Sequence, residues 1–149
     1  MDLITKGMAN WDKALNDYLS REKQMFTWTG HHPDGYIVTA KRMGNTVMYA
    51  FSVDNNRKQV KGWTQFTDAG FIPAGFRPTT SHYLTAESAP GIIDGKAADW
   101  SSGFLVVNPD GSLATRAFVI PSAVTDNPDS SWVNAKGTAT TSDDYPASN

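Results

Sequence analysis

The segment that most restricts the possible fold covers residues 104–120, where two apolar runs flank a short turn signal. The first run stops at residues 108–111, which read Asn-Pro-Asp-Gly, and apolar residues resume at Leu113. Proline presets φ for the first central position of a turn, and glycine accepts the positive φ that closes it. The spacing therefore predicts a β-hairpin, in which a tight turn joins two strands.

Alternating apolar and polar residues predict more strands. The clearest period of two covers residues 47–53, whose odd-numbered residues are apolar and share one face. A turn at residues 44–45, Gly-Asn, joins this run to a less regular strand that starts at Tyr36, so a second hairpin is expected. Further short strands are expected at residues 60–66, 82–85 and 132–145.

The remaining segments predict loops. A strand start at Phe26 and Trp28 is followed by a long polar turn over residues 29–35. Residues 71–78 are expected to run extended with turns, because each residue before a proline is pushed out of the helical region. Residues 87–102 form a polar insert.

A chain of 149 residues with this pattern favours one main domain. The count is about eight to ten short strands, a number typical of closed or stacked sheets. We therefore expect an all-β head over residues 26–149, an antiparallel β-sandwich or barrel with Greek-key or jelly-roll-like connections.

Residues 8–25 carry a helical signal, with Asn10 as a cap for a helix that starts at Trp11. Residues at steps of three and four form a stripe that is apolar except at Glu22: Met8, Trp11, Leu15, Tyr18, Glu22 and Met25. The helix can pack on its own domain, end a short parallel bundle of three copies, or form a disordered arm. Glu22 argues against such a bundle at its position, because a charged side chain is unfavourable in an apolar contact between helices. We treat residues 1–25 as a helical stalk or linker.

Composition excludes several classes of function. A net charge of −2 and a pI near 5.8 leave no clustered basic surface for nucleic acid. The chain has no cysteine, and so neither disulfides nor thiolate chemistry. No apolar run is long enough for membrane insertion, and residues 1–6 lack the order of a signal peptide. We expect a protein made in the bacterial cytoplasm that leaves by lysis or within a particle.

Two motifs carry a family resemblance. Residues 72–78 read IPAGFRP, and residues 103–113 read GFLVVNPDGSL. With GTAT at residues 137–140 and Tyr145 near the end, their order resembles the β-structured heads of phage receptor-binding proteins. These heads belong to tail fibres and baseplates of phages and prophages of Gram-positive, lactic-acid-type bacteria. The resemblance covers residues 60–146.

The resemblance implies a location in the virion, at the tail tip or baseplate, and a homotrimer joined in part by the N-terminal helices. The N-terminal segment would also attach to other baseplate or tail proteins. The implied function is host recognition, by binding a cell-wall saccharide or teichoic acid without catalysis. A purely structural baseplate or fibre subunit is the alternative, and a glycan depolymerase is a third.

Aromatic residues supply the candidate saccharide site. The chain has five tryptophans, and Trp63, Trp100 and Trp132 lie in polar sequence. An aromatic face packs against the C–H surface of a sugar while polar side chains bond its hydroxyls. For any single tryptophan, the alternative is a core or rim residue whose indole N–H is hydrogen-bonded, and this alternative is the commoner case.

Trp100 and its neighbour Asp99 form the preferred pair. The resemblance places a saccharide pocket near a tryptophan that precedes the hairpin, on loops distal to the helix. We expect His82, His31 or Trp63 to support this pair, from the same or a neighbouring subunit.

Three interpretations are open for residues 31, 32 and 34 (His, His and Asp): a metal site, an ordinary polar loop or a loop that contacts sugar. Neighbouring residues of a strand point to opposite faces, so His31 and His32 would share one ion only from an irregular turn. Neither a nucleophile elbow nor a phosphate-binding loop is found, and no carboxylate pair stands out. We expect no catalysis, no metal and no cofactor.

Overall fold

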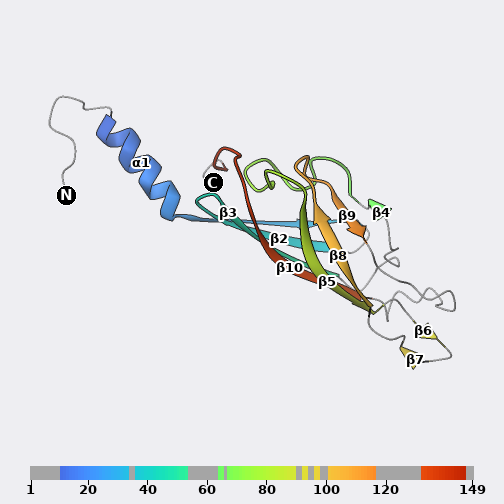
Figure 1. Ribbon diagram of the computed structural model, residues 1–149. Helices are drawn as coiled ribbons and strands as arrows, with labels where there is room; N and C mark the ends of the chain where they lie inside the picture. The colour runs from blue at the N-terminus through green and yellow to red at the C-terminus, as the bar shows by residue number, and fades with distance from the viewer. Residues whose placement is uncertain are drawn as a thin grey trace.

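A computed structural model describes most of the chain, and the structural account concerns the residues that it describes: 11–33, 36–53, 64–65, 67–89, 92–93, 96–97, 101–116 and 132–146. One helix leads into a β-structured head (Figure 1). The prediction of an all-β fold behind a short N-terminal helix is confirmed.

The elements follow one another from one helix through ten strand segments. Their bounds are α1 Trp11–Lys23, β1 Met25–His31, β2 Tyr36–Met43, β3 Thr46–Val53, β4 Thr64–Gln65, β5 His82–Ala89, β6 Ile92–Ile93, β7 Lys96–Ala97, β8 Ser101–Val107, β9 Leu113–Arg116 and β10 Trp132–Thr140.

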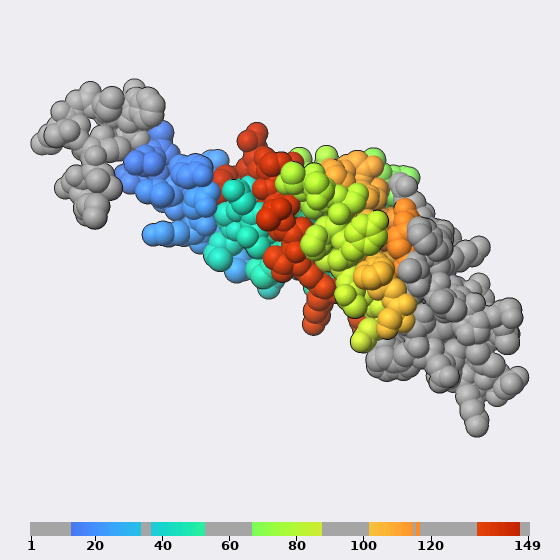
Figure 2. All heavy atoms as spheres, in the orientation of Figure 1, coloured from blue at the N-terminus to red at the C-terminus, as the bar shows by residue number. Residues whose placement is uncertain are grey.

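Eight of these strands form one curled antiparallel sheet in the order β1-β2-β3-β10-β5-β8-β9-β4. The last strand of the chain, β10, lies in the middle, between β3 and β5 (Figure 2). This position joins the N-terminal meander β1-β2-β3 to the later strands. Strands β6 and β7 pair separately.

Both predicted hairpins form. Strands β2 and β3 pair up to Met43 and Thr46, and Gly44 adopts a φ of 56° in the turn between them. The turn between β8 and β9 is closed by the Asn108 N–H, which donates to the Ser112 carbonyl at 3.0 Å. Gly111 has a φ of 84° there, as a turn glycine should.

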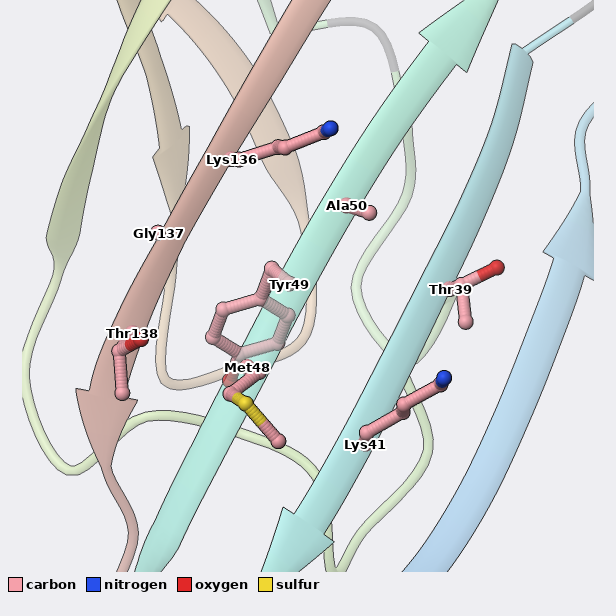
Figure 3. A pocket seen from close by; sticks show the side chains of 8 residues that line it. All are labelled: Thr39, Lys41, Met48, Tyr49, Ala50, Lys136, Gly137 and Thr138. Carbon is pink, nitrogen blue, oxygen red and sulfur yellow. The ribbon is translucent and has the colours of Figure 1, made fainter.

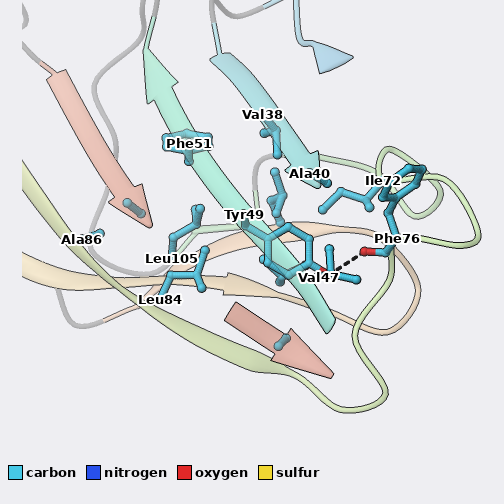
Figure 4. Packing of buried hydrophobic residues seen from close by; sticks show 14 of the residues in the cluster. Val38, Ala40, Val47, Tyr49, Phe51, Ile72, Phe76, Leu84, Ala86 and Leu105 are labelled. Atoms are coloured by element: carbon cyan, nitrogen blue, oxygen red, sulfur yellow. Dashed lines mark hydrogen bonds between the residues drawn. The ribbon is translucent and has the colours of Figure 1, made fainter. Parts of the chain in front are cut away.

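The core lies on the inner side of the curled sheet (Figure 4). Strand β3 contributes Val47, Tyr49 and Phe51, all of them buried and two residues apart. The loop from β4 to β5 adds Ile72 and Phe76 to this core. Thus the IPAGFRP motif packs into the concave side of the sheet.

The two sequence motifs contact each other. The Gly70 N–H donates to the Asp110 carbonyl at 2.7 Å, and the Ile72 N–H donates to the Gly111 carbonyl at 3.0 Å. A Cβ atom on Gly111 would lie 2.3 Å from the Ile72 carbonyl oxygen. Glycine at this position therefore permits both the turn and the close approach of the loop.

A buried arginine ties several distant segments together. Arg42 is 1% exposed, and its guanidinium donates to the backbone carbonyls of Gly44, Gly75, Asp143 and Asp144 at 2.7–2.9 Å. It also lies 4.4 Å from the centre of the Tyr145 ring. The carbonyl oxygens offset the cost of burying the charge.

Some predicted boundaries were wrong. The polar turn expected over residues 29–35 starts later, because Thr29, Gly30 and His31 belong to β1 and pair with β2. The insert expected over residues 87–102 is shorter, since β5 continues to Ala89 and β8 begins at Ser101. Pairing with neighbouring strands extends these segments despite their polar composition.

The last strand was predicted too long: it ends at Thr140, before Tyr145. The strand expected over residues 60–66 is described only at Thr64 and Gln65.

Helix α1 begins at Trp11, as predicted, and points away from the sheet (Figure 1). Its stripe residues Leu15 and Tyr18 are exposed, and so is Leu19. Glu22 is partly buried and accepts a hydrogen bond of 2.5 Å from the Tyr145 hydroxyl. The last turn of the helix is thereby attached to the head, while Leu15, Tyr18 and Leu19 stay uncovered by the described residues.

Candidate functional site

The residues predicted to bind saccharide are not gathered in the described structure. Trp63, Asp99 and Trp100 lie outside the described residues. His31 is exposed at the end of β1 far from the helix, and His82 is half-buried at the start of β5.

Strand register puts these two histidines at opposite ends of the sheet. His31 pairs with Ile37 at the end of the sheet that includes Ser52. His82 pairs with Val107 near the helix end, where Thr140 meets Thr46. The structure therefore does not bring His31 and His82 together.

His32 leaves the strand, and its ring packs edge-on against Phe71 with centroids 5.6 Å apart. Among the described residues no group of three or more histidine, aspartate or glutamate side chains has the arrangement of a metal site.

The described part of the chain offers a different candidate, the outer face of the sheet. This face consists of exposed side chains that alternate with the core residues along β2, β3, β10, β5 and β8. Threonines recur on it, as in the 3.3 Å contact between the Thr29 and Thr39 hydroxyls. Small polar side chains leave room between the longer ones.

A hollow of about 420 Å³ lies on this face across β2, β3 and β10 (Figure 3). We call it the lysine hollow, and its lining is Thr39, Lys41, Met48, Tyr49, Ala50, Lys136, Gly137 and Thr138. Its floor is low at Ala50, whose side chain is a single exposed methyl group. Lys41 and Lys136 stand on opposite sides of β3 in this view.

A second depression adjoins the first and shares Lys136 with it. We call it the polar trough, and it is lined by Thr85, Glu87, Asn134, Ala135 and Lys136. Its carboxylate, amide, hydroxyl and ammonium groups offer donors and acceptors of the kind that bond sugar hydroxyls.

An exposed aromatic pair stands on the same face of β5 and β8. Tyr83 is 56% exposed and Phe104 is 40% exposed, and their rings meet edge to face with centroids 5.8 Å apart. Tyr83 and Thr85 are two residues apart on β5, so both point outward. The pair therefore adjoins the polar trough.

Sequence reasoning missed most of this face. Alternation along β2 puts Lys41 on the face opposite Val38 and Ala40, but nothing local predicts that Lys136 lies across β3 from it. That neighbourhood depends on the insertion of β10 next to β3. Once the core residues of a strand are known, the residues that alternate with them are expected on the outer face, and this was the signal available from sequence.

The tyrosines near the core have perturbed acidity. Burial raises the pKa of Tyr49, whose hydroxyl donates to the Phe76 carbonyl at 2.5 Å. Burial and the hydrogen bond to Glu22 raise the pKa of Tyr145 to about 12. Hydrogen bonds from Tyr145 and then from Tyr18 lower the pKa of Glu22. These groups fasten the fold and the helix, and none of them lies among the outward-facing polar groups of the outer face.

Comparison with known protein families and with curated proteins found no match for this chain. The part of the chain that the structure describes contains no helix with the length and apolar character needed to cross a bilayer.

Proposed function

We propose that this protein is a phage tail or baseplate receptor-binding protein that recognises a host cell-surface saccharide without catalysis. The observation that carries the proposal is the exposed Tyr83–Phe104 pair beside the polar trough. Exposed aromatic side chains next to a trough of mixed donors and acceptors suit the alternating apolar and hydroxyl surfaces of a sugar.

The energetic demand on such a site is small. A shallow pocket that binds at about 1 mM contributes about −4 kcal/mol. Three pockets in a trimer, and several trimers on one particle, raise the overall avidity by a factor on the order of 10² to 10⁴. An open face on a sheet is therefore sufficient for attachment to a cell wall.

Assembly as a homotrimer is part of the proposal. The exposed Leu15, Tyr18 and Leu19 of α1 offer an apolar surface that parallel copies of the helix would bury. The N-terminal segment would also join the head to other baseplate or tail proteins in the virion. Light scattering coupled to size-exclusion chromatography tests this assembly, and a monomer near 16.2 kDa would contradict it.

The saccharide test compares two exposed apolar side chains of the same face. We expect Tyr83→Ala to weaken binding to host cell-wall polysaccharide by up to about tenfold, taking the contact of an aromatic ring as about 0.5–1.5 kcal/mol. Met43→Ala serves as the control, because Met43 is also exposed but lies on β2 at the helix end. Equal binding by both variants and the unchanged protein would reject the aromatic pair as the site.

A purely structural baseplate or fibre subunit is the second candidate function. The same aromatic pair and the exposed methionines Met25, Met43 and Met48 would then pack against neighbouring subunits. A glycan array separates the two candidates, because a structural subunit binds no glycan. Loss of polymer length on incubation would instead indicate a depolymerase. The loop site at Trp100 and Asp99 stays a prediction, tested by Trp100→Ala in the same binding assay.

A further inference from the structure

The lysine hollow has a charge that the proposed function alone does not explain. In the strand register, Lys41 of β2 lies opposite Met48 of β3, and Lys136 of β10 lies opposite Ala50 of β3. Two strand spacings across the sheet and one two-residue step along it put their Cα atoms roughly 12 Å apart. Both side chains are long and flexible, so the two ammonium groups can reach one ligand group held between them.

No negative side chain lines this hollow. Neither Lys41 nor Lys136 pairs with a carboxylate of the described residues. The whole chain has a net charge of −2, so two unpaired cations around one hollow stand out against an acidic background. Such a local excess of positive charge attracts anions.

The uncharged side chains of the hollow suit the uncharged part of a ligand that carries an anionic group. Thr39 and Thr138 offer hydroxyl donors, and Met48 and Ala50 offer apolar surface. A volume of about 420 Å³ falls in the range of small-molecule pockets. The hollow therefore has room for a charged group together with the polyol or sugar that carries it.

The adjoining trough has the opposite preference. Glu87 contributes a carboxylate there, which repels an anion and accepts hydrogen bonds from hydroxyl groups. Lys136 lines both depressions and so marks the boundary between them. The outer face thus offers two adjacent subsites. The lysine hollow suits an anion between Lys41 and Lys136, and the polar trough beyond Lys136 suits neutral hydroxyl groups.

We infer that the lysine hollow binds an oxyanion, either a phosphodiester or a carboxylate, that belongs to an anionic cell-wall glycopolymer. This inference rests on the proposed function and specifies its ligand class. The neutral part of the same polymer occupies the polar trough and contacts Tyr83 and Phe104.

The test measures binding of the full chain to three immobilised polymers: poly(glycerol phosphate), polygalacturonate and neutral dextran. We expect binding to one of the two anionic polymers, and the one bound identifies the anion. Replacing both lysines in Lys41→Ala/Lys136→Ala should lower that affinity about tenfold, because each partly exposed ion contact contributes about a factor of five or less. Raising the salt concentration should weaken the unchanged protein more than the double variant.

Lys23→Ala, an exposed lysine on α1, is the matched control and should bind as the unchanged protein does. Thermal unfolding verifies that the double variant is folded. If the double variant binds the anionic polymer as well as the unchanged protein does, or if dextran binds equally well, the inference is overturned. The proposed function survives in either case, provided that Tyr83→Ala still weakens binding. Binding of none of the three polymers, nor of host cell-wall polysaccharide, would overturn both.

Discussion

The two faces of the curled sheet are built from neighbouring residues of the same strands, yet they differ in almost every property. On β3 the inner face buries Tyr49 and Phe51, while the outer face exposes Met48 and Ala50. The inner face is closed by the loop that contributes Ile72 and Phe76. The fold depends on the inner face, so side chains of the outer face can be replaced with little effect on stability.

The sharpest contrast lies at two adjacent cations of β2. Arg42 points inward and gives its hydrogen bonds to four backbone carbonyls. Lys41 points outward into the lysine hollow and stays exposed. One position in sequence thus separates a structural cation from a candidate binding cation.

The largest effect is expected from Arg42→Met. The change leaves the carbonyls of Gly75, Asp143 and Asp144 without their donor. It should lower the free energy of unfolding by about 3–5 kcal/mol, since each buried carbonyl left unsatisfied costs about 1–3 kcal/mol. Lys41→Met, the matched change on the outer face, should alter it by less than about 0.5 kcal/mol. Urea unfolding followed by circular dichroism measures both. Similar losses in the two variants would refute the contrast between the faces.

Much of the inner face could be predicted from sequence. The period of two over residues 47–53 and the turns at residues 44–45 and 108–111 depend on local chemistry, and the structure confirms both hairpins. The role of Arg42 could not be predicted in the same way. It shares a face with Val38 and Ala40, but its carbonyl partners Gly75 and Asp143 come from segments far away in sequence.

The candidate site was harder to predict, because it combines strands from distant parts of the chain. Lys41 and Lys136 line the same hollow only because β10 lies beside β3, and no local pattern specifies that pairing. The support expected for Trp100 from His82, His31 or Trp63 stays a prediction, since Trp100 lies outside the described residues. Strand register adds that His31 and His82 of one chain lie at opposite ends of the sheet.

A second, smaller effect compares neighbours on β5. Leu84 is 1% exposed and packs against Gly137, where an added Cβ would lie 2.4 Å from its Cδ2 atom. Leu84→Ala should cost about 2–4 kcal/mol of unfolding free energy, since it leaves a cavity in the core. Thr85→Ala, which changes the lining of the polar trough, should cost less than about 0.5 kcal/mol.

The same denaturation experiment measures this pair. Saccharide binding should follow the reverse order, with Thr85→Ala weakening it while folded Leu84→Ala retains it. A Thr85→Ala protein that is as unstable as Leu84→Ala would show that the trough belongs to the core.

The smallest effect is expected where the head meets the exposed helix, at Glu22. Hydrogen bonds from Tyr145 and Tyr18 favour the ionised carboxylate, so the pKa of Glu22 in the folded protein lies below its ordinary value of 4.5. A lowered folded-state pKa means that this attachment is fully present above about pH 4.5 and is lost as the pH falls through the lowered value. We therefore expect the amide signals of residues 18–23 to change only below that pH.

An NMR titration of the Glu22 side chain measures its pKa directly. Tyr145→Phe removes the hydrogen bond that lowers this pKa most, and should move it back toward 4.5. Tyr83→Phe, which removes an exposed hydroxyl on the outer face, should leave it unchanged. The Tyr145 hydroxyl that holds Glu22 belongs to a ring that stacks on Arg42 and packs against Phe26, so this hydrogen bond links the helix to the packed side of the sheet. If Glu22 titrates at its ordinary value in the unchanged protein, the helix moves independently of the head in solution.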